Sequence, residues 1–236
     1  MKIYEVGGTV RDALLGLEPQ DFDYAIEAHS FTEMERGMRL QGMRISKLFP
    51  EFGVIKASFP VSGIVGNFTL CRKEGRYIDH RHPEFIEPTT IEEDLGRRDF
   101  TVNAIARDCS TGDYIDPFGG LDDIESRQLR TIGKAGEKFK EDPLRALRAI
   151  RFHVTRELDF DPDISRAFHS HQLPELMKSV SVERRREELL QCFAYDSLAT
   201  MDALGVFFPA SLKRAIFTDG LWIKPTLQER KRKRKN

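Results

Sequence analysis

The chain has 236 residues, 40% of them hydrophobic, so it can bury a sizeable core and is not an intrinsically disordered protein. Its 37 Lys and Arg residues nearly balance 38 Asp and Glu residues, and the net charge of -1 does not by itself indicate a polyanionic partner. Six of the basic residues lie consecutively at 230–235, which leaves 31 basic against 38 acidic residues elsewhere, a net of -7. Any strongly basic surface on the remaining chain must therefore be local.

The first residues contain no long apolar stretch, so we expect neither a signal peptide nor a membrane anchor. The sequence therefore predicts a cytoplasmic protein. The cysteines are widely spaced and odd in number, a pattern typical of reduced thiols rather than of a disulfide framework or a zinc site. They are Cys71, Cys109 and Cys192.

The hydrophobic pattern predicts an α+β domain followed by helices. Residues 1–134 mix helical stretches with short β-rich runs at 53–59 and 64–70. In residues 135–215 the apolar positions recur near helical spacing instead, which indicates a helical domain. Residues 216–236 form a short remainder that ends in the basic run.

The first candidate site combines a glycine pair with an Asp-x-Asp sequence. Gly7 and Gly8 would let backbone N–H groups approach a phosphate at the positive end of the following helix, although the pair could equally form only a tight turn. Asp21 and Asp23 would project from one face of a strand, while the residue between them enters the core. Two carboxylates with hard oxygen donors suit Mg²⁺. Arg11 could clamp a triphosphate oxygen or form an ion pair with a neighbouring aspartate.

The second candidate site lies within residues 93–106. Adjacent arginines beside an aspartate are poor core material, so this polar end of the segment is expected to face a cavity. Arg98 suits bidentate phosphate binding, and Asn103 could hydrogen-bond a ribose hydroxyl. For Asp99, structural ion pairing is a sufficient alternative.

The third candidate site is Glu141–Phe152, where Pro143 suits a first helical turn. Asp142 and Arg145 are three residues apart and lie on one helix face, where they place an acceptor beside a fork of donors. Such a pair could read the base edge of cytosine or adenine. The alternative is an ion pair between the two residues, worth a few tenths of a kcal/mol.

A charged helix is predicted at 182–190, with Ser181 as its N-cap. The run of charges is expected to form a solvated face of this helix.

The three candidate sites together resemble the class II tRNA nucleotidyltransferases, which are the CCA-adding enzymes, and the related bacterial poly(A) polymerases. The resemblance spans residues 3–210 and includes residues 116–123, which look like the family's turn between its catalytic head and its neck. It implies a polymerase-beta-like nucleotidyltransferase head at 1–134, an all-helical neck at 135–215, and a truncated body remnant with a basic tail at 216–236.

The resemblance also implies a role for each candidate residue. Gly7, Gly8 and Arg11 would handle the triphosphate, and Asp21 and Asp23 would bind two magnesium ions. The residues that would contact the incoming nucleotide's sugar and phosphates are Arg98, Asp99 and Asn103. The residues that would form or surround the amino-acid template for CTP and ATP are Asp142, Arg145, Glu141 and Arg148. The implied reaction adds CMP and AMP to the 3′ end of tRNA and releases pyrophosphate.

Two departures from the family's pattern are visible. Similar enzymes carry a third carboxylate where this chain has Asn67, and an amide cannot accept a proton from a 3′-hydroxyl. The chain also stops soon after the neck, so much of the expected tRNA-binding surface is absent. The basic tail could partly replace that surface, or it could be an incidental polyanion-binding terminus. Its residues are Arg230, Lys231, Arg232, Lys233, Arg234 and Lys235.

Three functional hypotheses therefore remain at this point. The first is CCA addition or repair on tRNA, and the second is poly(A) or partial CC/A addition by the same kind of site. The third is an RNA-binding or regulatory protein with weakened catalysis, an interpretation based on Asn67 and the short C-terminus.

Overall fold

The sheet order in the first half of the chain determines where the candidate site lies. The computed structural model describes residues 1–19, 21–74, 86–218 and 220–221. The chain divides into two units, Met1–Glu125 and Ser126–Asn236. The predicted three-part division at residues 134 and 215 stays a prediction.

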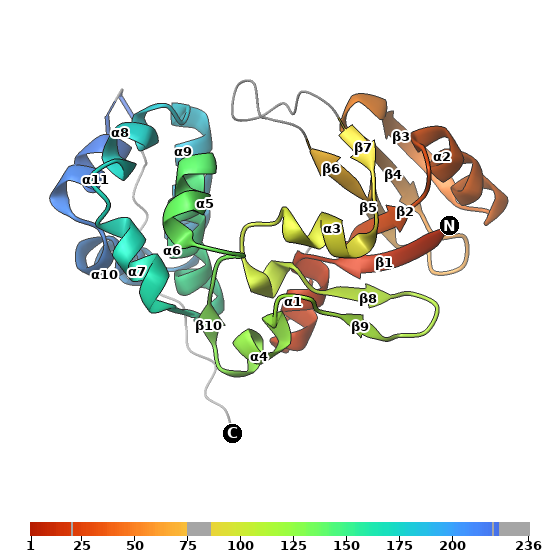
Figure 1. The fold of residues 1–236 in the computed structure, drawn as a ribbon, viewed down its shortest axis with the longest axis horizontal. Coiled ribbons are helices and arrows are strands. Elements are labelled where there is room, and N and C mark those ends of the chain that lie inside the picture. Colours follow the sequence, from red (N-terminus) through yellow and green to blue (C-terminus); the bar gives the residue numbers. More distant parts are fainter. Residues whose placement is uncertain (20, 75–85, 219, 222–236) are drawn as a thin grey trace. The chain divides into compact units, whose positions relative to one another are not determined.

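The first unit is an α+β domain built on one large sheet, as predicted (Figure 1). Its strands are β1 (Lys2–Val6), β2 (Asp23–Glu27), β3 (Arg44–Phe49), β4 (Val54–Ser58), β5 (Val65–Leu70), β6 (Arg72–Glu74), β7 (Ile86–Pro88), β8 (Ala106–Asp108) and β9 (Tyr114–Ile115). Its helices are α1 (Gly8–Leu14), α2 (Phe31–Leu40), α3 (Ile91–Gly96) and α4 (Gly120–Glu125), with 3₁₀ turns η1 (Pro50–Phe52) and η2 (Thr101–Asn103). The two β-rich runs predicted from the sequence are β4 and β5.

The main sheet has the strand order β3-β4-β5-β2-β1-β8-β9. The pair β2–β5 is parallel, and the other neighbours in this sheet are antiparallel. Strands β6 and β7 form a separate antiparallel pair. Strand β2 lies inside the sheet: Tyr24 pairs with Glu5 on β1 and with Phe68 on β5, and Asp23 pairs with Asn67 on β5.

One face of the sheet is packed by α2 (Figure 1). Ser30 caps this helix by accepting a hydrogen bond from the backbone N–H of Glu33, so the helix begins where its sequence predicts. Met34 and Met38, one helical turn apart, are buried against aromatic and aliphatic side chains from the strands. These include Tyr24 and Phe68, whose stacked rings lie 4.7 Å apart.

The second unit is helical, with one short parallel strand pair. Its helices are α5 (Ala135–Glu141), α6 (Leu144–Arg156), α7 (Pro162–Phe168), α8 (Leu173–Lys178), α9 (Val182–Tyr195), α10 (Ser197–Phe207) and α11 (Ala210–Ile216). The two strands are β10 (Gln128–Leu129) and β11 (Asp159–Phe160). The long helices α6 and α9 pack together, and α9 begins at the predicted N-cap Ser181.

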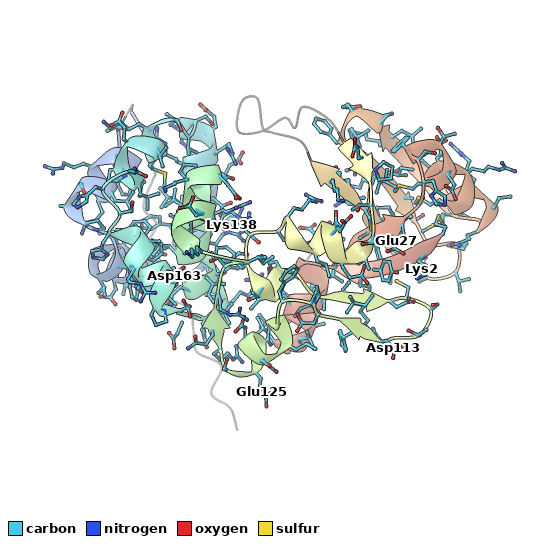
Figure 2. The ribbon with its side chains drawn as sticks, in the orientation of Figure 1. Lys2, Glu27, Asp113, Glu125, Lys138 and Asp163 are labelled. Atoms are coloured by element: carbon cyan, nitrogen blue, oxygen red, sulfur yellow. The ribbon has the colours of Figure 1, made fainter. Side chains whose placement is uncertain are left out.

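A carboxylate from α7 fixes the start of α5. Asp163 accepts a hydrogen bond of 2.7 Å from the backbone N–H of Ala135, and the side chains of Asp163 and of Lys138 on α5 are labelled in Figure 2. This bond, followed by the nearby Arg166, holds the pKa of Asp163 below its usual value despite some desolvation. The first residue of α5 is therefore held in place by α7.

All three cysteines are free thiols, as predicted. Cys192 is buried, and burial raises the pKa of its thiol to about 12, so it is not a thiolate at neutral pH. Among the described residues, no helix combines the length and apolarity that crossing a membrane requires.

Candidate active site

The turn between β1 and α1 requires glycine at its first position. Gly7 has a φ of 63°, and a Cβ there would lie 2.9 Å from Nη1 of Arg98. A Cβ on Gly8 would lie at an ordinary contact distance of 3.5 Å from Arg11 Nη2. The backbone and the approach of Arg98 thus explain Gly7, whereas the phosphate contact predicted for both glycines stays a prediction.

Thr9 connects this turn to both aspartates. Its hydroxyl donates to the carbonyl oxygen of Asp21 at 3.2 Å and accepts from the backbone N–H of Asp23 at 2.8 Å. Thr9 is almost fully buried, so these two hydrogen bonds are shielded from water. The start of β2 is therefore held against the first turn of α1.

The strand argument for the two aspartates was wrong in one respect. Asp23 is the first residue of β2, and Phe22 packs against the core as predicted. Asp21 lies in a bend before the strand and is exposed, and its carbonyl oxygen accepts a hydrogen bond from the Thr9 hydroxyl. Strand alternation therefore places Asp23 but not Asp21.

Asn67 lies directly opposite Asp23 in the parallel pair of β2 and β5. Its side-chain amide donates to Oδ1 of Asp23 at 3.2 Å, and its backbone N–H donates to the carbonyl oxygen of Phe22 at 2.9 Å. The position that lacks the expected carboxylate is thus a direct neighbour of an aspartate in the candidate site.

A buried polar chain links α1 to η2. Arg11 donates to Asp12 through Nε and Nη2, both at 2.8 Å, and to the amide oxygen of Asn103 through Nη1. The amide nitrogen of Asn103 donates to Asp99 at 2.8 Å, and the same carboxylate oxygen accepts from the N–H of Phe100. The ion-pair alternative for Arg11 is therefore present in the structure. Its predicted triphosphate contact stays a prediction.

Asp94 holds the arginine pair at the glycine turn. It is 1% exposed and accepts from Arg97 at 2.9 Å and from Arg98 at 3.1 Å. Burial alone would raise the pKa of Asp94, but the two guanidinium groups outweigh it and hold the pKa below its usual value. Arg98 also donates to the carbonyl oxygen of Asn103 at 3.3 Å. Its positive charge is thus fixed beside Gly7.

The turn at 116–123 supports the segment that carries Asn103. Asp116 accepts from the first two backbone N–H groups of α4, both at 2.8 Å, and so caps that helix. Asp123 on α4 accepts from the hydroxyl of Thr101. Because Thr101 opens η2, this bond fixes the turn that carries Asn103.

In the second unit, Asp142 lies between α5 and α6. Its Oδ1 accepts from the N–H of Leu144 at 3.1 Å, and its Oδ2 accepts from Arg184 on α9 at 3.1 Å. The carboxylate is one quarter exposed. Asp142 is therefore oriented by a helix start on one side and by a neighbouring helix on the other.

Arg145 is held by α5 and not by Asp142. Its Nη1 donates to Glu141 at 2.8 Å and to the carbonyl oxygen of Lys138 at 3.3 Å. Desolvation raises the pKa of Glu141, but hydrogen bonds from Lys138 and Arg145 outweigh it and keep this pKa below its usual value. Within the described residues, Asp142 and Arg145 form no ion pair with each other, so that alternative for the two residues is wrong.

Arg148 shares a carboxylate with its neighbour one turn on. Glu188 on α9 accepts from Arg148 at 3.4 Å and from Arg151 at 2.6 Å. The Arg151 guanidinium also lies 4.5 Å from the ring centroid of Phe152. The arginine-rich face of α6 is thus neutralised in part by one buried glutamate.

The charge run at 182–190 was expected to be a solvated face, and this expectation was wrong for two of its charged residues. Arg185 and Glu188 are buried. Arg185 Nη1 donates to the carbonyl oxygens of Ala215 and Ile216 at 2.8 and 2.7 Å, and so caps the end of α11. These two side chains point inward because Glu188 pairs with the α6 arginines and Arg185 binds the last carbonyls of α11.

Comparison with known proteins identifies the family. A family model described as the poly(A) polymerase head domain matches residues 3–130. This chain belongs to that family. Its members are nucleotidyltransferases that use divalent metal ions.

Curated relatives of this chain include CCA-adding enzymes. The chain is 40% identical over 192 residues to that of Geobacillus kaustophilus strain HTA426, which covers 81% of this chain and 45% of the relative. It is 36% identical over 214 residues to that of Streptococcus pyogenes serotype M2 strain MGAS10270, which covers 83% of this chain and 50% of the relative. The chain thus spans about half the length of these relatives.

Solved structures from the family share the fold. The Bacillus stearothermophilus CCA-adding enzyme in complex with CTP matches with a TM-score of 0.72 and 30% identity, over 91% of this chain and 53% of that one. A tRNA nucleotidyltransferase complexed with a primer tRNA and an incoming ATP analog matches with a TM-score of 0.69 and 30% identity, over 87% and 57% of the two chains.

The donor set of the head fits a divalent metal that the family implies. Asp21 is exposed and Asp23 is partly exposed, so both can offer carboxylate oxygens to an ion shared with a nucleotide's phosphates. Asn67 offers only a neutral amide oxygen. No group of three or more acidic, His or Cys side chains suited to a metal occurs among the described residues.

Four supporting residues were missed in the sequence: Thr9, Asp94, Arg184 and Glu188. Thr9 and Asp94 lie inside the first two candidate segments, where a hydroxyl after the glycines and an acid before the arginines were available signals. Arg184 and Glu188 could not be found this way, because their partners Asp142 and Arg148 are 42 and 40 residues away in the sequence. The tail residues Arg230–Lys235 lie outside the described residues.

Proposed function

We propose that this chain is the catalytic part of an RNA nucleotidyltransferase that adds CMP and AMP to the 3′ end of tRNA, as in CCA addition or repair. The observation that carries the proposal is the Thr9 hydroxyl, which ties the Gly7–Gly8 turn to Asp21 and Asp23. A phosphate-binding loop and a metal-binding carboxylate pair must be adjacent for nucleotidyl transfer, and the two hydrogen bonds of Thr9 to the backbone of Asp21 and Asp23 support that arrangement. The substrates are CTP and ATP.

In the head, each side chain has a part in holding the triphosphate. The backbone at Gly7 and Gly8, with Arg98 beside it, binds the β- and γ-phosphates, and Asp94 keeps the Arg98 guanidinium in place. Arg11 supports Asn103, which contacts the sugar together with Asp99. This set of residues orients the α-phosphate for attack.

Asp21 and Asp23 would hold Mg²⁺ together with the phosphates of the nucleotide. Bound there, the metal supplies charge neutralisation on the leaving pyrophosphate and activation of the 3′-hydroxyl. The 3′-oxygen forms a bond to the α-phosphorus as the bond to pyrophosphate breaks, and the hydroxyl proton leaves. Asn67 cannot take that proton, so an aspartate or water must.

In the neck, Asp142 and Arg145 would read the base. Toward the described residues, each oxygen of Asp142 accepts one hydrogen bond, so Asp142 keeps acceptor capacity. Toward the same residues, the Arg145 side chain donates only through Nη1, which leaves Nη2 and Nε as donors. An acceptor and a donor side by side match the amine and ring acceptor of cytosine or adenine. Arg148 lies one turn further along the same helix.

Two observations support other functions. The family model is described by poly(A) polymerases, which favours long ATP addition by the same site as the second candidate. Asn67 favours a weakened enzyme that chiefly binds RNA. The basic tail at 230–235 would contact RNA in any of these proteins, and a cytoplasmic location suits them all.

The test is incubation with tRNA lacking its 3′ end and each of the four labelled NTPs in turn, with Mg²⁺. We expect CMP and AMP incorporation that stops after a few nucleotides and is abolished by Asp21→Ala. UTP or GTP incorporated as readily as CTP contradicts the template assignment. A long ATP ladder on a generic RNA supports the polymerase, and RNA binding without incorporation supports the third candidate.

A further inference from the structure

One row of side chains crosses four strands of the head in register. Asp23 on β2 pairs with Asn67 on β5, Asn67 pairs with Lys56 on β4, and Lys56 pairs with Lys47 on β3. Residues directly opposite on neighbouring strands lie on the same face of a sheet. The row therefore runs from the candidate active site to the edge of the sheet, on the face opposite the α2 core.

The two lysines at the end of this row face each other without a counter-charge. Both are exposed, and neither forms an ion pair with any residue that the structure describes. Like charges directly opposite across two strands destabilise a sheet. An edge lysine can serve to prevent strand pairing between molecules, which accounts for Lys47 on β3. It does not account for Lys56, because β4 is an inner strand.

The direction of the row agrees with the direction from which a nucleophile must come. The turn at Gly7 and the Arg98 guanidinium lie on the β1 side of Asp23, where the pyrophosphate would be held. In phosphoryl transfer the attacking and leaving oxygens lie roughly in line. The 3′-hydroxyl must then approach from the other side of Asp23, which is the side of β5, β4 and β3.

We propose that Lys47 and Lys56 bind backbone phosphates of the acceptor RNA strand just upstream of its 3′ end. With strands spaced by about 4.8 Å, the two lysines lie about 14 and 10 Å from Asp23, a distance of a few nucleotides. A phosphate between them also relieves their mutual repulsion. This inference rests on the proposed function, since it takes the acceptor to be RNA and Asp23 to be at the reaction centre.

The first experiment measures binding of a fluorescent tRNA acceptor hairpin that lacks its CCA end, over a salt series. The Lys47→Gln/Lys56→Gln variant is compared with the wild type and with Lys2→Gln/Lys178→Gln. The control removes two exposed lysines that have carboxylate partners, Lys2 with Glu27 at 3.8 Å (both labelled in Figure 2) and Lys178 with Glu175 at 2.7 Å.

For the test variant we expect about 20-fold weaker binding at 0.1 M salt, and a log–log salt slope smaller by about 1.4, since each single-strand phosphate contact contributes about 0.7. Its thermal stability without RNA should equal or exceed that of the wild type, because a repulsive pair is removed. The control should bind as the wild type does. If the test variant binds with the affinity and slope of the control, the proposal is wrong.

The second experiment separates this inference from the proposed function. In steady-state CMP incorporation we expect the test variant to raise KM for RNA about 20-fold while KM for CTP and kcat stay within twofold. A raised KM for CTP would overturn the proposal, because the lysines would then serve the nucleotide. If the wild type incorporates nothing, the proposed function fails, and the binding measurement still decides whether the lysines hold RNA.

Discussion

The side-chain amide of Asn67 donates a hydrogen bond to Asp23. A carboxylate at position 67 would instead repel the carboxylate of Asp23. The amide thus stabilises the folded head without metal but supplies neither a third negative charge nor a proton acceptor. At this position, stability without metal and the chemistry of transfer are opposed.

For Asn67→Asp we expect faster nucleotide incorporation, by about 100-fold where proton removal limits the rate. Without metal the variant should be less stable by about 1–2 kcal/mol, because two carboxylates replace a hydrogen-bonded pair. Adding Mg²⁺ should restore that loss. Thermal unfolding in EDTA and in Mg²⁺, beside a single-turnover assay, measures both effects, and a stability loss that Mg²⁺ leaves unchanged would contradict them.

Asp94 is the second residue on which the head depends, because it neutralises two arginines in a nearly inaccessible position. Asp94→Asn should lower the free energy of unfolding by about 3 kcal/mol at pH 7. Since the pKa of Asp94 is depressed in the folded state, its contribution is complete above the unfolded-state pKa of about 4 and is lost as the pH falls below that.

Urea unfolding of wild type and Asp94→Asn at pH 7, 5 and 3.5 tests this dependence. The difference between the two proteins should be equal at pH 7 and 5 and smaller at pH 3.5. A difference that grows on acidification would mean that Asp94 is protonated in the folded head.

At the scale of elements, α9 acts as a positioning helix for α6. Arg184 and Glu188 lie one turn apart on α9. Arg184 pairs with the acidic Asp142, and Glu188 pairs with the basic Arg148 and Arg151. Of the two side chains proposed to read the base, α9 therefore holds Asp142, whereas Arg145 is held by α5.

Arg184→Ala should loosen Asp142 and so relax base selection. We expect misincorporation of UTP to rise about tenfold relative to CTP, with a loss of stability below about 1 kcal/mol, because the pair is partly exposed. Arg186→Ala is the matched control on the same helix and should change neither quantity. Unchanged selectivity in Arg184→Ala would show that the cap at Leu144 suffices to hold Asp142.

At the scale of the whole molecule, the unequal charge distribution predicts how RNA binding depends on salt. Without residues 230–235 the chain has a net charge of -7, so a polyanion meets net repulsion apart from local basic sites. Deleting 230–235 should weaken RNA binding and reduce the log–log salt slope by up to about 4. Anisotropy titrations from 50 to about 300 mM salt measure this, and an unchanged slope would make the tail incidental.

Much of the fold and the outline of the site could be predicted because their signals are local. The glycine pair, the Asp-x-Asp sequence, and the strands β4 and β5 each occupy one short segment. Partners distant in sequence could not be predicted. Arg11 and Asn103 are 92 residues apart, and the inward direction of Arg185 depends on carbonyl groups at the end of α11. A charged residue is therefore predicted to be exposed to solvent unless its buried partner is known.

The register of β2 and β5 also has an evolutionary consequence. Asn67 is held opposite Asp23 by backbone pairing, which a change of side chain leaves intact. Codons for asparagine and aspartate differ by one transition at their first base. The head therefore stands a single point mutation from a carboxylate opposite Asp23, with the backbone already in place, and descendants could gain or lose that carboxylate without rebuilding the sheet.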